Sequence, residues 1–295
     1  MSKGAKSPRL PFTVAVNLIL VGESGHGKNE QIRRIWAAEE DGERPFRRCL
    51  FLASEASATV ASAEIIGAPT TVFRHIESPE DLISAIDMIS EGINGEPFQL
   101  VAFDGWSHLQ DRAKADERAH GGKDAKDNRV MAAQASPRMR QAAAAWTAAM
   151  GKHPGVLFVS TCHTVEEWKQ RPGSKDIKDR VRVGYKLDLS GEPAKFIRRE
   201  GNAIVFLTRV LKDITDWTTG EDDEELEQNL AQLRQHRAEG HFAPRYFAIT
   251  EPVKFQGDTL DFIKWQDGLL PEEARPAIYN PNLGELLLAS PLRNR

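Results

Sequence analysis

Short apolar runs alternate with amphipathic segments over most of this chain. The apolar runs have the length of β-strands and fall at 13–21, 48–53, 71–75, 98–104, 156–162 and 246–249. Apolar residues recur at helical spacing in the segments at 29–39, 81–89, 137–150, 221–237 and 282–288. Strands that alternate with helices in this order predict an α/β fold, in which a mainly parallel sheet carries helices on both faces.

The remaining stretches carry weaker patterns. Residues 112–129 are polar and include glycine, which predicts a loop, and 164–185 form a second polar, basic excursion. Phe196 and Ile197, followed by the apolar run at 203–210, predict two late strands paired as a hairpin. The domain organisation expected from these elements is a flexible arm at 1–12, a core at 13–210 and a C-terminal extension at 211–295.

Composition narrows the class of protein. The chain has 295 residues, of which 40% are hydrophobic and 28% are charged, as is ordinary for a globular domain. No apolar run reaches the roughly 18 residues of a membrane span, and residues 1–11 lack the apolar core of a signal peptide. Cys49 and Cys162 fall inside apolar runs, which favours buried free thiols over disulfides. We therefore expect a cytoplasmic protein that makes no membrane contact.

The net charge of −4 is unevenly distributed. Basic residues outnumber acidic ones from 169 to 199, whereas 221–227 is almost wholly acidic. A local basic patch can meet phosphates even when the whole chain is acidic. Either stretch can equally be a solvated surface, and the acidic one can be a partner site.

A glycine-rich turn follows the first apolar run. Its residues, with the spacing G-x-x-x-x-G-K of a P-loop, are Gly22, Glu23, Ser24, Gly25, His26, Gly27, Lys28 and Asn29. Such a turn directs backbone N–H groups and a helix N-terminus at the phosphates of ATP, and Lys28 adds a positive charge. Asn29 stands where a hydroxyl usually binds Mg²⁺, and its amide oxygen can still hold a hard cation. The alternative is a glycine-rich turn without a ligand.

Three polar residues follow later strands. Asp104 ends the run at 98–104, where a carboxylate can meet the Mg²⁺ at the phosphates. Glu55 follows the run at 48–53 and can activate the water that attacks the γ-phosphate. His163 follows the run at 156–162 and can sense that phosphate. Carboxyl ends of parallel strands gather at one edge of a sheet, although each residue also has a purely structural interpretation.

Together these residues resemble the core of RecA-like P-loop ATPases over residues 13–210. The resemblance rests on the turn at 22–29, on Glu55, on Asp104 and on the polar strand end with Thr161 and His163. Within that group the chain is most similar to phage-encoded RecA-like nucleotide-binding proteins, including single-strand annealing recombinases. The C-terminal stretch 259–287 also resembles that subgroup. There a Lys-x-Arg pair reaches the neighbouring subunit's site, and Lys264 and Gln266 occupy its two positions here.

The resemblance implies an ATP- and Mg²⁺-dependent protein that forms a homo-oligomeric ring or filament on single-stranded DNA. Lys28, Glu55 and His163 would be catalytic, and Asn29 and Asp104 would serve Mg²⁺. The DNA-facing segments would be 112–129 and 169–186, with Trp168 and Tyr185 placed to stack on bases. The phosphate-neutralising residues expected in the second segment are Lys175, Lys178, Arg180 and Arg182.

Two other functions fit the same sequence. Asn29 and Gln266 also suit a nucleotide-dependent assembly protein that hydrolyses ATP slowly or not at all. The arginine-bearing stretch 171–182 could instead be the phosphate lid of a P-loop phosphotransferase. The position of Glu55 favours water activation over this last function.

Overall fold

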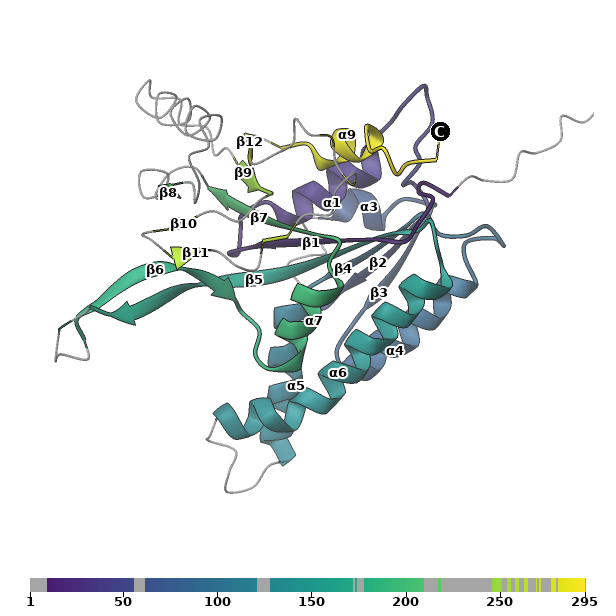
Figure 1. Cartoon of the computed structure of the whole chain (residues 1–295). Coiled ribbons are helices and arrows are strands. Elements are labelled where there is room, and N and C mark those ends of the chain that lie inside the picture. Colours follow the sequence, from purple (N-terminus) through teal and green to yellow (C-terminus); the bar gives the residue numbers. More distant parts are fainter. Residues whose placement is uncertain are drawn as a thin grey trace, which may run out of the picture.

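The computed structural model describes residues 10–55, 62–120, 128–171, 173, 178–209, 217–218, 246–250, 254–255, 258–259, 263–264, 269, 271, 277–279 and 281–294. These residues form an α/β fold in which helices flank a mainly parallel central sheet (Figure 1). Among the described residues, no helix combines the length and the apolar character that crossing a membrane demands.

The central sheet has the strand order β12-β9-β7-β1-β5-β4-β2-β3. All neighbours from β7 to β3 run parallel, whereas β9 runs antiparallel to β7 and β12 antiparallel to β9. The strand bounds are β1 Val16–Gly22, β2 Cys49–Ala53, β3 Thr71–His75, β4 Leu100–Asp104, β5 Leu157–Gln170, β7 Ala203–Arg209, β9 Tyr246–Ile249 and β12 Ala277–Tyr279. The predicted strands at 13–21, 48–53, 71–75, 98–104, 156–162 and 246–249 are thus confirmed.

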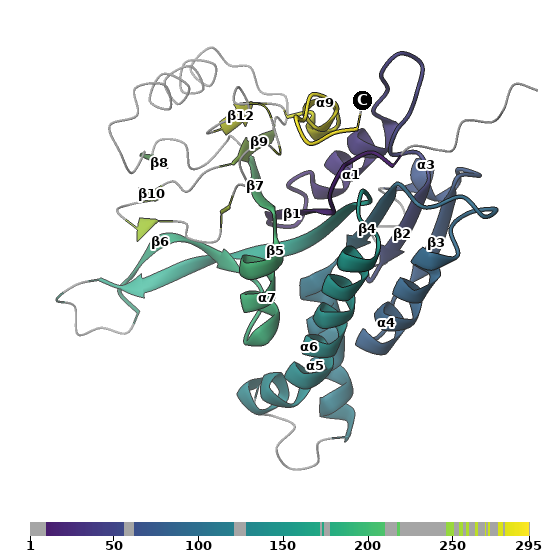
Figure 2. The same ribbon diagram turned by 45° about the vertical axis from the view of Figure 1, so that its right-hand side comes forward.

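Helices cover both faces of the sheet, as predicted (Figures 1 and 2). Alternate residues of β1 divide between the two cores, with Ile19 and Val21 in one and Leu18 and Leu20 in the other. The helices on one side are α1 Lys28–Ala37, α3 Ala63–Ile66 and α9 Leu283–Leu288. Those on the other side are α4 Pro79–Asp87 with the 3-10 turn η1 Met88–Ser90, α5 Trp106–His120, α6 Asn128–Lys152 and α7 Glu192–Glu200.

The loop predicted at 112–129 is wrong, because α5 continues to His120 and α6 begins at Asn128. Residues 121–127 lie outside the described residues. Although α5 is polar in composition, it buries Trp106, Leu109 and Ala113 completely. Arg138 of α6 also pairs with Asp116 and Glu117 of α5, at 3.2 and 3.5 Å. Packing against α6 therefore stabilises α5 as a helix, which the spacing of apolar residues did not predict.

The polar excursion at 164–185 is largely a β-ribbon. β5 extends past the sheet to Gln170 and pairs antiparallel with β6 Arg180–Leu187, from Thr164↔Leu187 to Gln170↔Arg180. We call this ribbon the β5–β6 arm; in both views it projects away from the helices (Figures 1 and 2). A ribbon with solvent on much of its surface needs no continuous apolar run, which explains its polar sequence.

The hairpin predicted from Phe196, Ile197 and 203–210 is also wrong. Phe196 and Ile197 belong to α7 and are buried, whereas β7 pairs parallel with β1. Two adjacent apolar residues suit a strand or the inner side of a short helix equally well, and packing on α6 and the sheet decides between them.

Elements near the C-terminus complete the described structure. The predicted closing helix is confirmed as α9, with Asn282 as its N-cap. A small separate sheet comprises β8 Trp217–Thr218, β10 Lys254–Phe255 and β11 Asp258–Thr259. The predicted helix at 221–237 lies outside the described residues.

Candidate functional site

The loop at 22–29 joins the carboxyl end of β1 to the start of α1. Gly25 and Gly27 adopt the left-handed φ values of 76° and 84° that glycine tolerates best. Gly27 is the N-cap of α1 and no side chain caps the helix. The N–H groups of the first helical turn have no intrahelical acceptor, and Ser24 and Gly25 at the loop apex are exposed. The loop therefore presents backbone donors to an anion.

Lys28 is buried beneath this loop, with 6% of its surface exposed. Its Nζ donates to the backbone oxygens of Gly22 and Glu23, both at 2.9 Å. Burial lowers the pKa of Lys28, and the negative charges of Asp104 and Glu55 oppose that shift. The ammonium group thus lies within the electrostatic reach of both predicted carboxylates.

Asp104, at the end of β4, is almost completely buried. Its Oδ1 accepts a 2.5 Å hydrogen bond from Thr161 Oγ1, and its Oδ2 accepts one from Asn29 Nδ2 at 2.9 Å. Burial raises the pKa of Asp104, while these two donors and Lys28 oppose the increase. Asn29 Oδ1 is buried and has no hydrogen-bond partner among the described residues. An unsatisfied amide oxygen beside a carboxylate is a donor set that suits Mg²⁺.

Glu55 and His163 meet across the sheet edge, with 2.8 Å between Glu55 Oε1 and His163 Nε2. Glu55 follows β2 and His163 belongs to β5, with β4 between these strands. Both side chains are about one-fifth exposed, at 18% and 22%. The backbone N–H of His163 also donates to Ser107 Oγ at 2.9 Å. The strand order therefore places a carboxylate and an imidazole together at the rim of the Lys28 site.

Sequence reasoning placed His26 in the loop but missed its contact with β7, and it missed the contact of Ser54 with the end of β4. Ser54 Oγ contacts the backbone oxygens of Asp104 and Gly105, at 3.1 and 2.9 Å, and so joins the ends of β2 and β4. Gly105 has a φ of 120°, a backbone conformation that favours glycine, and a Cβ there would approach Ser54 Oγ to 2.1 Å. His26 lies 3.3 Å from the carbonyl of Leu207 and connects the loop to β7. The position of Ser54 at the end of a predicted strand is the one sequence signal that could have indicated its contact with Asp104 and Gly105.

Three of the four predicted nucleic-acid residues lie on or next to the β5–β6 arm, away from the Lys28 site. Lys178 and Arg180 are exposed there, and Arg182 occupies the β6 position opposite Trp168. Lys175 lies outside the described residues. Trp168 is 49% exposed, as base stacking requires.

Tyr185, the other residue predicted to stack on bases, is buried. It is 4% exposed and its ring packs 5.2 Å from that of Phe206, centroid to centroid. Its predicted role in base stacking is therefore wrong, because the base of the arm is part of the core.

Lys264 lies beside β7. Its backbone exchanges hydrogen bonds with Ile204, near the amino end of β7, at 2.7 and 3.3 Å. Its Nζ donates to the carbonyl of Arg199 at 3.2 Å. Ile204 also pairs with Ile19 of β1, three residues before Gly22, so β7 lies between Lys264 and the strand that leads into the loop at 22–29. Gln266 lies outside the described residues.

Both predicted cysteine thiols, Cys49 and Cys162, are buried and free. Burial raises the pKa of Cys162 to about 12, so its thiol stays protonated beside Ser107.

Comparison with known proteins adds no assignment: the sequence matches no protein-family model and no curated protein. The functional interpretation therefore depends on the geometry of the Lys28 site.

Proposed function

We propose that this chain is a RecA-like ATPase that oligomerises and binds single-stranded DNA, as in phage recombination or replication. One observation carries the proposal: the strand order gathers two carboxylates, Asp104 and Glu55, at the sheet edge beside the buried ammonium of Lys28. Asp104 also contacts Asn29 of the loop. A glycine-rich turn without a ligand would not explain why two carboxylates and a buried ammonium group lie together at this edge of the sheet.

The residues present suit ATP and Mg²⁺. The backbone N–H groups of the loop around Gly25 and Gly27 and of the uncapped start of α1 would hold the phosphates. Lys28 would turn from its backbone acceptors toward these phosphates. Asn29 Oδ1 and Asp104 would hold Mg²⁺, since the first lacks a partner and the second is a buried carboxylate. When bound, the ion would neutralise charge on the phosphates and polarise the γ-phosphoryl group.

Glu55 would take the proton of the attacking water. His163, 2.8 Å from its carboxylate, would hold the side chain in position for that transfer. Glu55→Gln keeps the size of the side chain and removes the base, so turnover should fall by roughly 10²–10⁴-fold while ATP binding persists. Glu64→Gln, a change at the exposed end of a surface ion pair, is the matched control. Unchanged turnover of the Glu55 variant would remove this role.

The DNA-binding part of the proposal draws on the β5–β6 arm, where Lys178 and Arg180 accompany an exposed tryptophan. Filter binding of an oligo-dT probe with and without ATP tests it, and binding should weaken as salt increases. Absence of binding at low salt would eliminate this part and leave the nucleotide site unaffected. Electron microscopy with a non-hydrolysable ATP analogue tests assembly.

A second function is favoured by one contact. Asn29 Nδ2 donates a hydrogen bond to Asp104 Oδ2, an oxygen that would otherwise be available to a metal. This contact suits an ATP-dependent assembly protein with slow hydrolysis. Asn29→Thr supplies the usual hydroxyl and should raise turnover if the other catalytic groups are competent. A rate that stays near zero, with ATP binding retained, would favour the assembly protein.

A further inference from the structure

A groove of about 800 Å³ lies between α6 and α7, on the opposite face of the sheet from α1. Its floor consists of small and apolar side chains, and basic side chains line it. The lining residues are Arg140, Ala143, Ala144, Thr147 and Ala148 from α6, and Lys195, Phe196, Arg198 and Arg199 from α7. None of them is acidic. The Lys28 site uses none of these residues.

The basic side chains of this groove lie at the surface of the protein. Arg199 contacts Glu200 of the next position at 2.5 Å, and its side chain is 77% exposed. Arg140, Lys195 and Arg198 are also exposed. Four cations around an apolar floor suit an occupant that combines carboxylates with apolar side chains.

Nucleic acid fits the floor poorly. Bases bind single-strand platforms by stacking on exposed aromatic rings, and Phe196, the aromatic residue of the lining, is only 6% exposed. A row of alanines instead permits the close approach of another backbone. Amphipathic helices dock in grooves of this kind by their apolar stripe.

The chain itself contains a sequence of that chemistry. Every residue from 221 to 227 is Asp or Glu except Leu226, and Leu230 and Leu233 continue the apolar spacing. This acidic segment, defined here as 221–233, lies between β8 and β9 in the chain. In both views these strands lie across the β5–β6 arm from α6 and α7 (Figures 1 and 2). That placement favours insertion into a neighbouring copy over insertion into the same chain.

We propose that the groove between α6 and α7 binds the acidic segment of a second copy of this chain. The contact is heterologous, since the groove of one copy receives the segment of the next, and repetition gives a ring or a filament. The inference deepens the oligomerisation in the proposed function by naming a surface for it. It does not depend on ATP hydrolysis or on DNA.

Complementary charge reversals in the full-length protein test this contact. The groove variant carries Arg140→Glu and Arg198→Glu. The segment variant carries Asp222→Lys, Asp223→Lys, Glu225→Lys and Glu227→Lys. Each should self-associate at least about tenfold more weakly than the parent in sedimentation velocity, since like charges then face each other. Mixing the two variants should restore association, because the acidic groove of one meets the basic segment of the other.

Lys152→Glu, an exposed change at the end of α6 outside the groove, is the matched control and should leave association unchanged. Recovery in the mixture excludes misfolding as the cause of the loss. A parent that stays monomeric with or without nucleotide, a groove variant that associates normally, or a mixture that fails to associate would overturn the inference. Loss of oligo-dT binding without loss of association would also overturn it, in favour of nucleic acid.

A parallel titration with a fluorescent ATP analogue separates this inference from the proposed function. Groove-dependent association without nucleotide binding would support the contact and contradict the ATPase. Nucleotide binding together with association that does not depend on the groove would support the nucleotide site and contradict the contact.

Discussion

Asp104 illustrates at the scale of one residue how a buried carboxylate lowers stability. Its carboxylate accepts hydrogen bonds from Thr161 and Asn29, yet burial still raises its pKa. The folded state therefore holds a proton on Asp104 more tightly than the unfolded state does. As pH rises from the ordinary aspartate value through the raised one, the folded state loses stability. At neutral pH without Mg²⁺, the ionised form is a net cost.

Asp104→Asn should therefore increase the free energy of unfolding at pH 7 by about 1 kcal/mol when Mg²⁺ is absent. Asn29 Oδ1, which lacks a partner among the described residues, can accept from the new amide after a flip of the Asn29 side chain. Urea denaturation in EDTA at pH 7 and at lower pH measures the effect. The gain should shrink as pH falls, because Asp104 of the parent then becomes protonated.

Asp111→Asn is the control for this experiment, since Asp111 is exposed and pairs at the surface with Lys114, at 3.1 Å. It should change stability by a few tenths of a kcal/mol. A destabilised Asp104→Asn protein at neutral pH would contradict the account of the buried charge.

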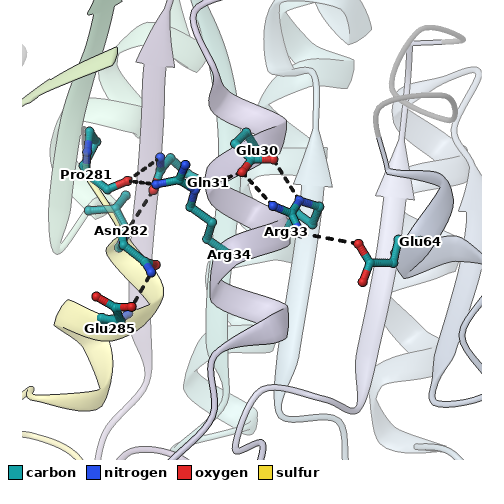
Figure 3. Close-up of polar contacts among 9 residues, drawn as sticks. Glu30, Gln31, Arg33, Arg34, Glu64, Pro281, Asn282 and Glu285 are labelled. Atoms are coloured by element: carbon teal, nitrogen blue, oxygen red, sulfur yellow. Dashed lines mark hydrogen bonds and ion pairs between the residues drawn. The ribbon is translucent and has the colours of Figure 1, made fainter. Parts of the chain in front are cut away.

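At the scale of elements, the attachment of α9 to α1 depends on one buried amide. Gln31 Nε2 donates to the carbonyl of Pro281 at 2.8 Å, and Gln31 Oε1 accepts from the N–H of Leu283 at 3.1 Å (Figure 3). Arg34 Nη1 also donates to Pro281 O at 2.7 Å. A Cβ at Gly284 would approach the Arg34 carbonyl to 2.3 Å, so only glycine allows α9 this close to α1.

Gln31→Leu should lower the free energy of unfolding by about 2–4 kcal/mol, because it leaves the buried Leu283 N–H without its acceptor and removes a donor from Pro281 O. Arg33→Ala is the control on the same helix. Arg33 pairs with Glu30 and Glu64 near the surface, as Figure 3 shows, and should contribute about 0–1 kcal/mol. Equal losses in the two variants, measured by chemical denaturation, would show that the amide has no special role.

The β5–β6 arm gives a second prediction for an element. Trp168→Ala should weaken oligo-dT binding by about 1–3 kcal/mol, the typical contribution of one stacked base. Its ring is exposed, and its Nε1 donates to Glu166 Oε2 of the same strand at 3.1 Å. Val165→Ala, at another exposed position of β5, is the matched control. Fluorescence anisotropy that shows no difference between the variants would remove Trp168 from the DNA interface.

For the whole molecule, ligand binding should increase stability because only the folded state assembles the Lys28 site from distant segments. ATP with Mg²⁺ at about 100 times its dissociation constant should add about 2.7 kcal/mol to the free energy of unfolding. Chelating the metal should remove part of this gain, since Asn29 and Asp104 then lose their proposed ligand. Differential scanning calorimetry with ATP, ATP–Mg²⁺ and Mg²⁺ alone measures each contribution; equal transition temperatures in all three would contradict the proposed nucleotide site.

Several features of the molecule follow directly from the amino-acid sequence. Periodicity predicted most parallel strands and the helices at 29–39, 81–89, 137–150 and 282–288, because hydrophobic spacing reports locally on the face that a residue buries. The residues gathered around Lys28 were also foreseeable, since carboxyl ends of parallel strands share one edge of a sheet. The roles proposed for these residues stay predictions.

Other features were decided only by the tertiary structure. The order β1-β5-β4-β2 brings His163 within 2.8 Å of Glu55, a pairing that no local pattern specifies. Packing against α6 made a helix of the polar α5 and of the apolar pair in α7, and core contacts buried Tyr185 at the base of the arm. The reason is physical: spacing along the chain encodes which side of an element is apolar, whereas the neighbour that covers that side is chosen by contacts between residues far apart in sequence.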